Sequence, residues 1–159
     1  MHLLYQILDL VRHWFRRRRT RPDLALGQRA EDIAHRYLQR RGYVVVARNY
    51  RAANGSGELD IVACRDGVMV FVEVKSRVSE EFGPPERAIG AEKQEHVFKV
   101  ARDYLLRRGE EPPPIRFDVI TVVFGEHCRI DHQPDAFAPR RSLVRPSDIE
   151  VRRSATAWR

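Results

Sequence analysis

The feature that most limits how this chain can fold is an Asp66-Gly67 pair between two strand-like runs. The runs, 57–65 and 68–77, are rich in apolar and β-branched residues. An Asp-Gly pair between such runs is typical of a two-residue β-hairpin turn. The turn fixes the register of a hairpin, so residues at equal distances from it are expected to face each other.

This register brings two carboxylates together. Asp60 and Glu73 lie six residues from the turn on its two sides, which predicts directly opposed positions with Cβ atoms about 5 Å apart. Carboxylates so close repel each other unless a positive charge lies between them. Mg²⁺ commonly takes one or two protein carboxylates and completes its shell with waters and phosphate oxygens. We therefore expect a divalent-cation site that faces a phosphate.

Three further side chains are candidates for this site. Lys75 shares a strand face with Glu73, because side chains alternate along a strand, and could orient or deprotonate an attacking water. Glu58 shares a face with Asp60, and Glu31 lies at the border of the apolar face of the preceding helix. Both could bind the metal indirectly or hold its waters. A Glu-x-Lys pattern alone is more often a solvated strand surface, and the combination with Asp60 favours a site.

The remaining segments predict helices and strands around this hairpin. Apolar residues recur at helical spacing in 24–41 and 91–108, each followed by a glycine, and Asp23 is a candidate N-cap of the first helix. Further strands are expected at 43–50 and 115–124, and a shorter one at about 128–132. The order α-β-β-β-α-β-β predicts an α/β fold, a mixed sheet flanked by helices.

Positive charge is concentrated at the two ends of the chain. Of the net charge of +7 over 159 residues, +5 lies in 1–21 and +4 in 140–159, which leaves 22–139 at −2. We expect a basic N-terminal arm, a central domain at 22–139 and a flexible basic tail. Basic arms can attract phosphate backbones, and they can equally be solvated tails.

Other features concern location and membranes. Two cysteines are too few for a disulfide framework and lack zinc-finger spacing, which favours the cytoplasm. Leu3, Ile7, Leu10 and Trp14 predict a short amphipathic helix that could lie on an anionic membrane or pack on the domain. No run reaches the roughly 20 apolar residues that a transmembrane helix needs.

Several polar residues could contact a nucleic-acid backbone. Lys93 and Gln94 lie at the start of the second helix, near the expected path of a substrate. Arg48 and Arg51 follow the first helix and could bind phosphates. An ordinary solvated surface explains these residues about equally well. Asp118, among apolar residues, is more consistent with a structural carboxylate that is satisfied inside the core.

Five segments together resemble the uncharacterised YraN-like family of small bacterial proteins and, more widely, the PD-(D/E)XK nuclease superfamily. The segments are Gly27-Gln28-Arg29-Ala30-Glu31, Arg48-Asn49-Tyr50-Arg51, Gly57-Glu58-Leu59-Asp60-Ile61-Val62, Phe71-Val72-Glu73-Val74-Lys75-Ser76-Arg77 and Arg116-Phe117-Asp118-Val119-Ile120. The resemblance covers about 24–138 and leaves out both arms. The chain has Leu59 where the pattern that names the superfamily has proline.

The resemblance implies a restriction-endonuclease-like core and a set of roles. In the superfamily, carboxylates that match Asp60 and Glu73 bind Mg²⁺ (or Mn²⁺), and the lysine that matches Lys75 assists catalysis. In the similar archaeal Holliday junction resolvases, a glutamate at the position of Glu31 contributes as well. Arg77, at the end of the matching segment, is a further candidate for nucleic-acid binding.

Three functions are therefore open. The first is a divalent-metal-dependent endonuclease that hydrolyses DNA, branched or single-stranded, with a homodimer as one option because junction cleavage usually needs a two-fold assembly. The second is a non-catalytic nucleic-acid-binding protein with a nuclease-like fold, whose arms make the principal contacts. The third is peripheral membrane or partner docking through the N-terminal arm, which we rank last.

Overall fold

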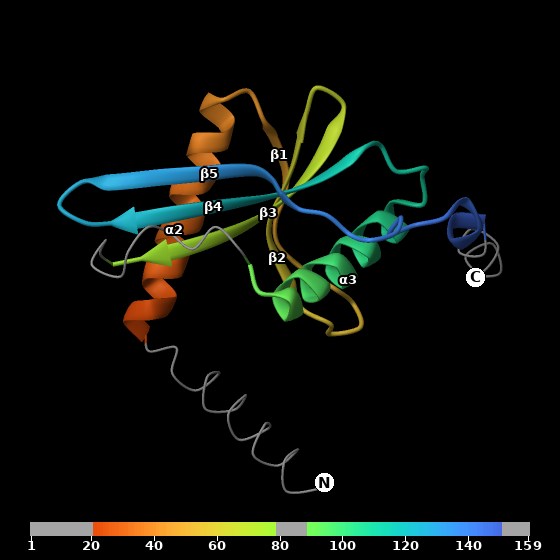
Figure 1. Cartoon of the computed structure of the whole chain (residues 1–159), viewed down its shortest axis with the longest axis horizontal. Coiled ribbons are helices and arrows are strands. Elements are labelled where there is room, and N and C mark those ends of the chain that lie inside the picture. Colours follow the sequence, from red (N-terminus) through yellow and green to blue (C-terminus); the bar gives the residue numbers. More distant parts are fainter. Residues whose placement is uncertain (1–20, 79–88, 151–159) are drawn as a thin grey trace, which may run out of the picture.

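A mixed β-sheet carries one long helix on each face (Figure 1). The computed structural model describes residues 21–78 and 89–150, and within them five strands form one sheet in the order β1-β2-β3-β4-β5. The elements are α2 (Arg21–Arg40), β1 (Val44–Arg51), β2 (Glu58–Arg65), β3 (Val68–Arg77), α3 (Ala91–Arg108), β4 (Ile115–Phe124) and β5 (Cys128–Phe137). This confirms the predicted fold class and element order.

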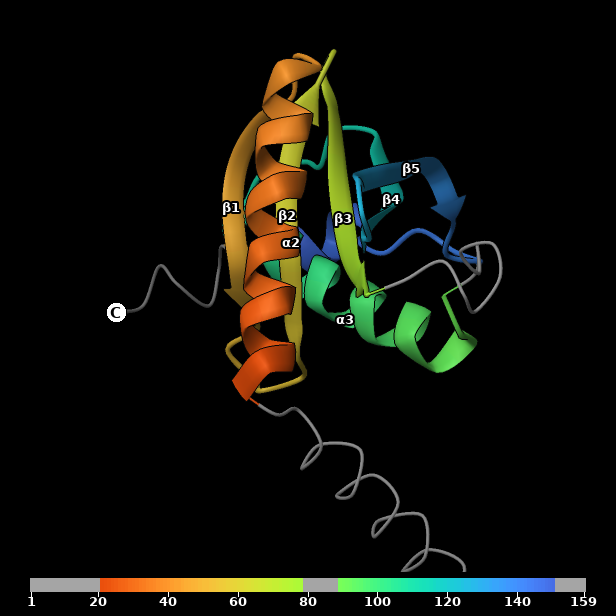
Figure 2. The same cartoon turned by 90° about the vertical axis from the view of Figure 1, so that its left-hand side faces the viewer.

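The strand pairing follows from the connections. β1, β2 and β3 form an antiparallel meander, β3 and β4 run parallel, and β4 and β5 form a second antiparallel hairpin. A parallel pair needs a long crossover, which here contains α3. The crossover places α3 on the face of the sheet opposite to α2 (Figure 2).

Each helix covers its own apolar layer. Ala30, Ala34 and Leu38 recur at helical spacing and pack α2 against one face of the sheet, in a cluster that includes Val70 and Val72. The layer beneath α3 is aromatic, and the Phe71 and Phe117 rings stack there with centroids 5.3 Å apart. The central strands are buried on both faces, which explains their nearly continuous apolar sequence.

Asp118 is a structural carboxylate, as expected from its apolar surroundings. It is fully buried, and its two oxygens accept bonds from Arg116 Nε at 2.7 Å, Arg116 Nη2 at 2.8 Å and the Asp135 backbone N–H at 3.0 Å. His132 Nε2 lies 2.9 Å away. Burial alone would raise the pKa of Asp118, but the bonds to His132, Arg116 and Asp135 outweigh burial and lower its pKa. The network ties β4 to β5.

Three boundaries differ from the sequence-based prediction. The helix α2 begins at Arg21, so Asp23 is not its N-cap but an acid of its first turn, where a negative charge complements the helix dipole. The strand β5 extends to Phe137, beyond the predicted short strand. Residues 140–150 differ from the expected flexible tail, because Val144 and Ile149 are buried in the aromatic layer and Arg102 donates to the Leu143 carbonyl at 3.0 Å.

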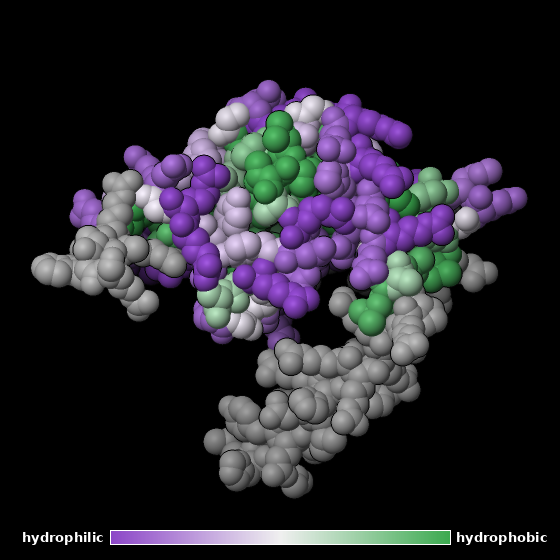
Figure 3. Space-filling view, turned by 180° about the vertical axis from the view of Figure 1, so that it is seen from behind, coloured by the Kyte–Doolittle hydropathy of each residue, from purple (hydrophilic) through white to green (hydrophobic). Residues whose placement is uncertain are grey.

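The predicted amphipathic helix at 1–21 and residues 151–159 lie outside the described residues, apart from Arg21. Among the helices that the structure describes, none is long and apolar enough to cross a bilayer. The surface seen from behind is mainly hydrophilic, with an apolar patch near the start of β1, where Val44 and Val46 are 64% and 45% exposed (Figure 3).

Candidate functional site

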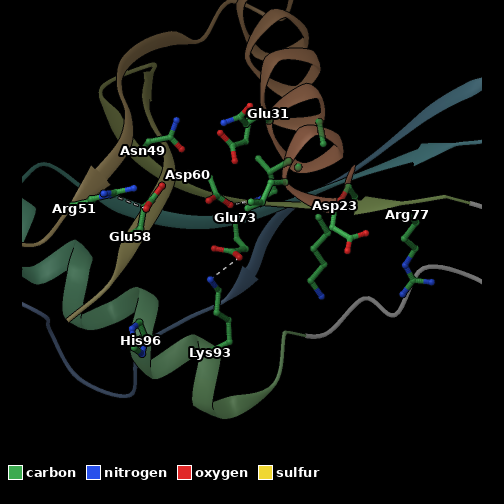
Figure 4. Close-up of a pocket in the computed structure, with 17 residues that line it drawn as sticks. Asp23, Glu31, Asn49, Arg51, Glu58, Asp60, Glu73, Arg77, Lys93 and His96 are labelled. Atoms are coloured by element: carbon green, nitrogen blue, oxygen red, sulfur yellow. Dashed lines mark hydrogen bonds and ion pairs between the residues drawn. The ribbon is translucent and has the colours of Figure 1, made fainter. Parts of the chain in front are cut away.

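A cavity of about 920 Å³ opens where α2 begins, β2 begins, β3 ends and α3 begins. These four ends all lie in the lower half of the molecule in Figure 2. The cavity wall is strongly charged and mixes acids with bases (Figure 4). Its charged lining residues are Asp23, Glu31, Arg51, Glu58, Asp60, Glu73, Lys75, Arg77 and Lys93.

Asp60 lies where the β2–β3 ladder opens. The paired residues run from Arg65↔Val68 to Ile61↔Val72, so the register predicted from the turn is confirmed and the next opposed positions are Asp60 and Glu73. Instead of continuing the ladder, Asp60 Oδ2 accepts the Val74 backbone N–H at 2.7 Å. The carboxylate therefore occupies the seam between the two strands.

The surroundings of Asp60 disfavour its negative charge. Burial first, and then the negative charge of Glu73, raise the pKa of Asp60 to about 7. The hydrogen bond from Val74 and the charge of Lys93 act in the opposite direction without cancelling this effect. A carboxylate in this position gains strongly from an added cation.

Glu73 faces the cavity from β3 and forms an ion pair with a lysine of α3. Its side chain is 10% exposed, and its Oε1 lies 2.8 Å from the Nζ of Lys93, whose side chain is 45% exposed. Lys93 belongs to the first turn of α3 and reaches toward Glu73, while Asp60 lies beyond the carboxylate (Figure 4). This ion pair joins α3 to the seam.

Glu31 approaches the same seam from α2. The pKa of Glu31 is raised, first by burial and then by the negative charge of Asp60. A hydrogen bond with the Asn49 side chain and the charge of Arg48 act in the opposite direction without cancelling this rise. Asn49 adopts the left-handed conformation, with φ of 49°, inside β1. This backbone conformation is one that asparagine tolerates better than most residues.

The other predicted metal ligand, Glu58, lies at the rim. Its Oε2 is 3.0 Å from Arg51 Nε, and the two residues are direct partners of the β1–β2 ladder. Its negative charge adds to the repulsion on Asp60 and Glu31. The cavity therefore brings together all four predicted carboxylates, with Asp60 and Glu73 deepest in the strand seam.

The predicted basic residues divide into two groups. Lys75, Arg77, Arg51 and Lys93 line the cavity together with the acids. Arg48 is not among the lining residues, and its Nη2 is 2.6 Å from Asp32 Oδ1. Gln94 is not among them either, since its Nε2 donates to the Ile89 carbonyl at 2.7 Å at the start of α3.

Sequence reasoning assigned no role to Asn49 or His96, which both line the cavity. A Cβ on Gly57 would overlap the His96 ring, so the glycine allows α3 to approach the loop before β2. Gly57 also has φ of 141°, a backbone conformation that favours glycine. The glycine was visible in the sequence, but its helical partner was not.

The donor set fits a loosely coordinated hard cation. Among the described residues, no three His, Cys, Asp or Glu side chains form a ready-made metal group. Asp60 and Glu73 nevertheless offer two oxygen donors in one seam, and the raised pKa of Asp60 indicates a deficit of positive charge. Mg²⁺ and Mn²⁺ suit such a site, because Mg²⁺ usually keeps several waters and takes substrate phosphates as ligands.

Comparison with known proteins identifies the family. The model of the uncharacterised protein family UPF0102 matches residues 30–122, which include Glu31, Asp60, Glu73, Lys75 and Lys93. The chain belongs to the family UPF0102. This confirms the resemblance to the YraN-like family. A UPF0102 protein of Solibacter usitatus (strain Ellin6076) is 43% identical over 135 residues, 85% of this chain and 98% of the relative.

Other members of UPF0102 have similar sequence identities to this chain. A protein of Symbiobacterium thermophilum is 44% identical over 105 residues, 66% of this chain and 87% of the relative. One from Geobacter metallireducens (strain ATCC 53774 / DSM 7210 / GS-15) is 43% identical over 115 residues, 71% of this chain and 92% of the relative. The similarity extends over most of each relative, so it concerns the whole UPF0102 domain.

Proposed function

We propose that this UPF0102 protein is a nuclease of the PD-(D/E)XK type that uses Mg²⁺ or Mn²⁺ to hydrolyse phosphodiester bonds in DNA. The observation that carries the proposal is the pair of opposed carboxylates, Asp60 and Glu73, at the open end of the β2–β3 ladder, with Lys75 lining the same cavity. The resemblance to the superfamily adds to this geometry.

Each residue has a chemical task in this proposal. Asp60 and Glu73 would hold the cation, and Glu31 would orient waters at the α2 side of the cavity. When bound, the cation would supply Lewis-acid chemistry, polarising the phosphate and favouring ionisation of a water. Lys75 takes up or directs the proton of the attacking water and stabilises charge that develops on the phosphorus oxygens. The water oxygen forms a bond to phosphorus, the bond from phosphorus to the leaving sugar oxygen breaks, and that oxygen takes a proton from solvent.

The rim fits a polyanionic strand. Arg51, Arg77 and Lys93 line the mouth of the cavity and can neutralise phosphates on either side of the scissile bond. Such contacts position a backbone without reading its sequence, so we expect a preference for a DNA structure, branched or single-stranded, over a base sequence. A homodimer acting in the cytoplasm is part of the same proposal.

The decisive test is cleavage of labelled single-stranded, duplex and four-way-junction DNA by the full-length protein with Mg²⁺ or Mn²⁺. Glu73→Gln should lower the cleavage rate at least about 100-fold, because it removes a charged metal ligand from the transition state. Asp66→Asn is the matched control, since it changes an exposed acid in the turn of the same hairpin and asparagine tolerates the positive φ there. Equal cleavage by Glu73→Gln and the wild type would refute this site.

A second candidate function is nucleic-acid binding without catalysis. The observation that favours it is that Lys93 already supplies a positive charge to Glu73, while the described residues form no ready-made metal group. In that case DNA binding survives Asp60→Asn and falls when Arg16, Arg17, Arg18 and Arg19 are replaced by glutamine in the full-length chain. Retained affinity in the arginine variant would count against this candidate.

A further inference from the structure

Lys93 places a positive charge in direct contact with the carboxylate seam. Its Nζ lies 2.8 Å from Glu73 Oε1, and its charge also lowers the pKa of Asp60. It comes from α3, a different element from the β3 strand that carries Lys75. Lys93 therefore reaches the acids from the opposite side of the cavity and forms a separate part of the site.

The contact has the geometry of an internal counterion. Glu73 is nearly buried, whereas about half of the Lys93 side chain is exposed, so the ammonium joins a buried carboxylate to the exposed rim of the cavity. Figure 4 shows the Lys93 side chain extending from α3 to the carboxylate, with its tip between α3 and the seam. A long aliphatic stem can place the same ammonium elsewhere at the rim without moving the helix.

A divalent cation and the Lys93 ammonium cannot share Glu73 comfortably. Lys93 already holds Oε1 at 2.8 Å, and positive charges within a few ångströms of each other repel strongly in a partly buried site. Building on the proposed function, we propose that Lys93 is a displaceable counterion: it neutralises Glu73 in the metal-free protein, leaves when a divalent cation binds, and then contacts a phosphate of the substrate strand.

The role differs from that of a fixed structural ion pair. A structural pair would keep the site assembled, so its loss would weaken metal binding. A displaceable counterion competes with the metal, and its loss strengthens metal binding. The same exchange couples the two ligands, because the cation frees an ammonium that a phosphate can use. Lys93 thus changes its partner from Glu73 to a substrate phosphate when the metal binds.

The first measurement is Mn²⁺ and Mg²⁺ affinity by calorimetry at pH 8 on the full-length protein. Lys93→Met removes the ammonium and keeps a flexible stem, and it should bind the metals about tenfold more tightly because a competing positive charge is gone. Lys93→Arg should restore affinity close to that of the wild type. Lys99→Met is the matched control, since Lys99 lies on the same helix but lines a different pocket, and its affinity should not change.

The second measurement tests whether the Lys93 ammonium contacts a phosphate of the bound strand. Binding of a nuclease-resistant phosphorothioate strand is measured over a range of salt concentrations, with Mg²⁺ and with EDTA. With Mg²⁺, Lys93→Met should reduce the slope of log affinity against log salt by about one phosphate contact. With EDTA the slopes of the wild type and Lys93→Met should agree, because Glu73 holds Lys93 in the metal-free wild type and the ammonium makes no phosphate contact.

The outcomes separate this inference from the function on which it rests. Metal affinity that depends on Asp60 but is unchanged or weaker in Lys93→Met overturns the counterion role and leaves the nuclease proposal standing. A wild-type protein that binds neither metal overturns both. Circular dichroism of each variant shows whether the fold is retained, and weaker binding by a correctly folded Lys93→Met supports a structural pair.

Discussion

Asp60 is the residue at which stability and chemistry oppose each other. Its carboxylate accepts a strand N–H and lies beside Glu73 in a place that raises its pKa to about 7. The folded protein therefore binds a proton there that the unfolded chain, with an ordinary pKa of 3.8, has released at mildly acidic pH. At neutral pH and above, keeping this partly buried carboxylate ionised costs folding free energy, and such perturbed groups cluster at ligand-binding sites.

The pH dependence of stability follows from this raised pKa. The contribution of Asp60 is most favourable below pH 4 and is lost as the pH rises through about 7, because the folded state must then carry the buried charge. We expect Asp60→Asn to be more stable than the wild type at pH 8 by about 1–3 kcal/mol, and the gain to shrink toward pH 5.

Urea unfolding at pH 5, 6, 7 and 8 without divalent cations measures this difference in unfolding free energy. Asp66→Asn is again the control, since that exposed acid should show no comparable trend. An Asp60→Asn protein that is less stable than the wild type at pH 8 would show that the carboxylate mainly supports the fold.

At the scale of the elements, two aspartates have pKa values that are shifted in opposite directions. The pKa of Asp60 is raised at the open end of β2 and β3, whereas several hydrogen bonds lower the pKa of Asp118 between β4 and β5. The first pair of strands carries the charged cavity and the second pair is held firmly on the far side of the sheet. The charged cavity and the buried Asp118 network therefore lie on different strand pairs of the same sheet.

Asp118→Asn should destabilise the protein by about 3 kcal/mol at pH 7, since it leaves the Arg116 charge without its bidentate partner. The lowered pKa of Asp118 gives a contribution that is fully present above the ordinary pKa of 3.8 and is lost as the pH falls through the lower folded value. The difference between the two proteins should therefore narrow below about pH 4.

Thermal or urea unfolding of both proteins between pH 2.5 and 7 checks this prediction. Replacing Asp131, a partly buried acid of β5 outside the network, by asparagine is the control, and it should change stability little. A pH-independent difference would show that the hydrogen bonds matter and the charge does not.

The sequence predicted the elements whose causes are local. The Asp66-Gly67 turn alone set the opposition of Asp60 and Glu73, and periodicity located both helices. Contacts between layers were not predictable in the same way. The pairing of Lys93 with Glu73 and the packing of His96 on Gly57 depend on where the crossover places α3, which residue spacing does not contain.

At the scale of the whole molecule, the domain extends further than composition suggests. Val144, next to Leu143, and Ile149 are among the few apolar residues of an arginine-rich stretch, and no periodic pattern marked them. Both are buried against the layer beneath α3, and Asp148 bonds Arg102 of that helix with an N–O distance of 3.2 Å. The segment 142–149 therefore supports α3 from the side away from the cavity.

Ile149→Ala should lower the unfolding free energy by about 2–4 kcal/mol, because it removes a buried side chain and leaves a cavity. Val44→Ala removes an apolar side chain that is 64% exposed and should cost less than about 1 kcal/mol. Urea unfolding of the full-length variants gives both values. Equal losses would indicate that 142–149 contributes little to the folded domain.

The bond between Asp60 and the Val74 amide gives the protein a built-in reporter. A cation that draws the carboxylate toward itself lengthens or breaks this bond, so the ¹⁵N–¹H resonance of Val74 should shift as Mg²⁺ is added and its amide should exchange faster with solvent. Occupancy of the seam could then be followed at one backbone position, in the intact protein and before any substrate is known.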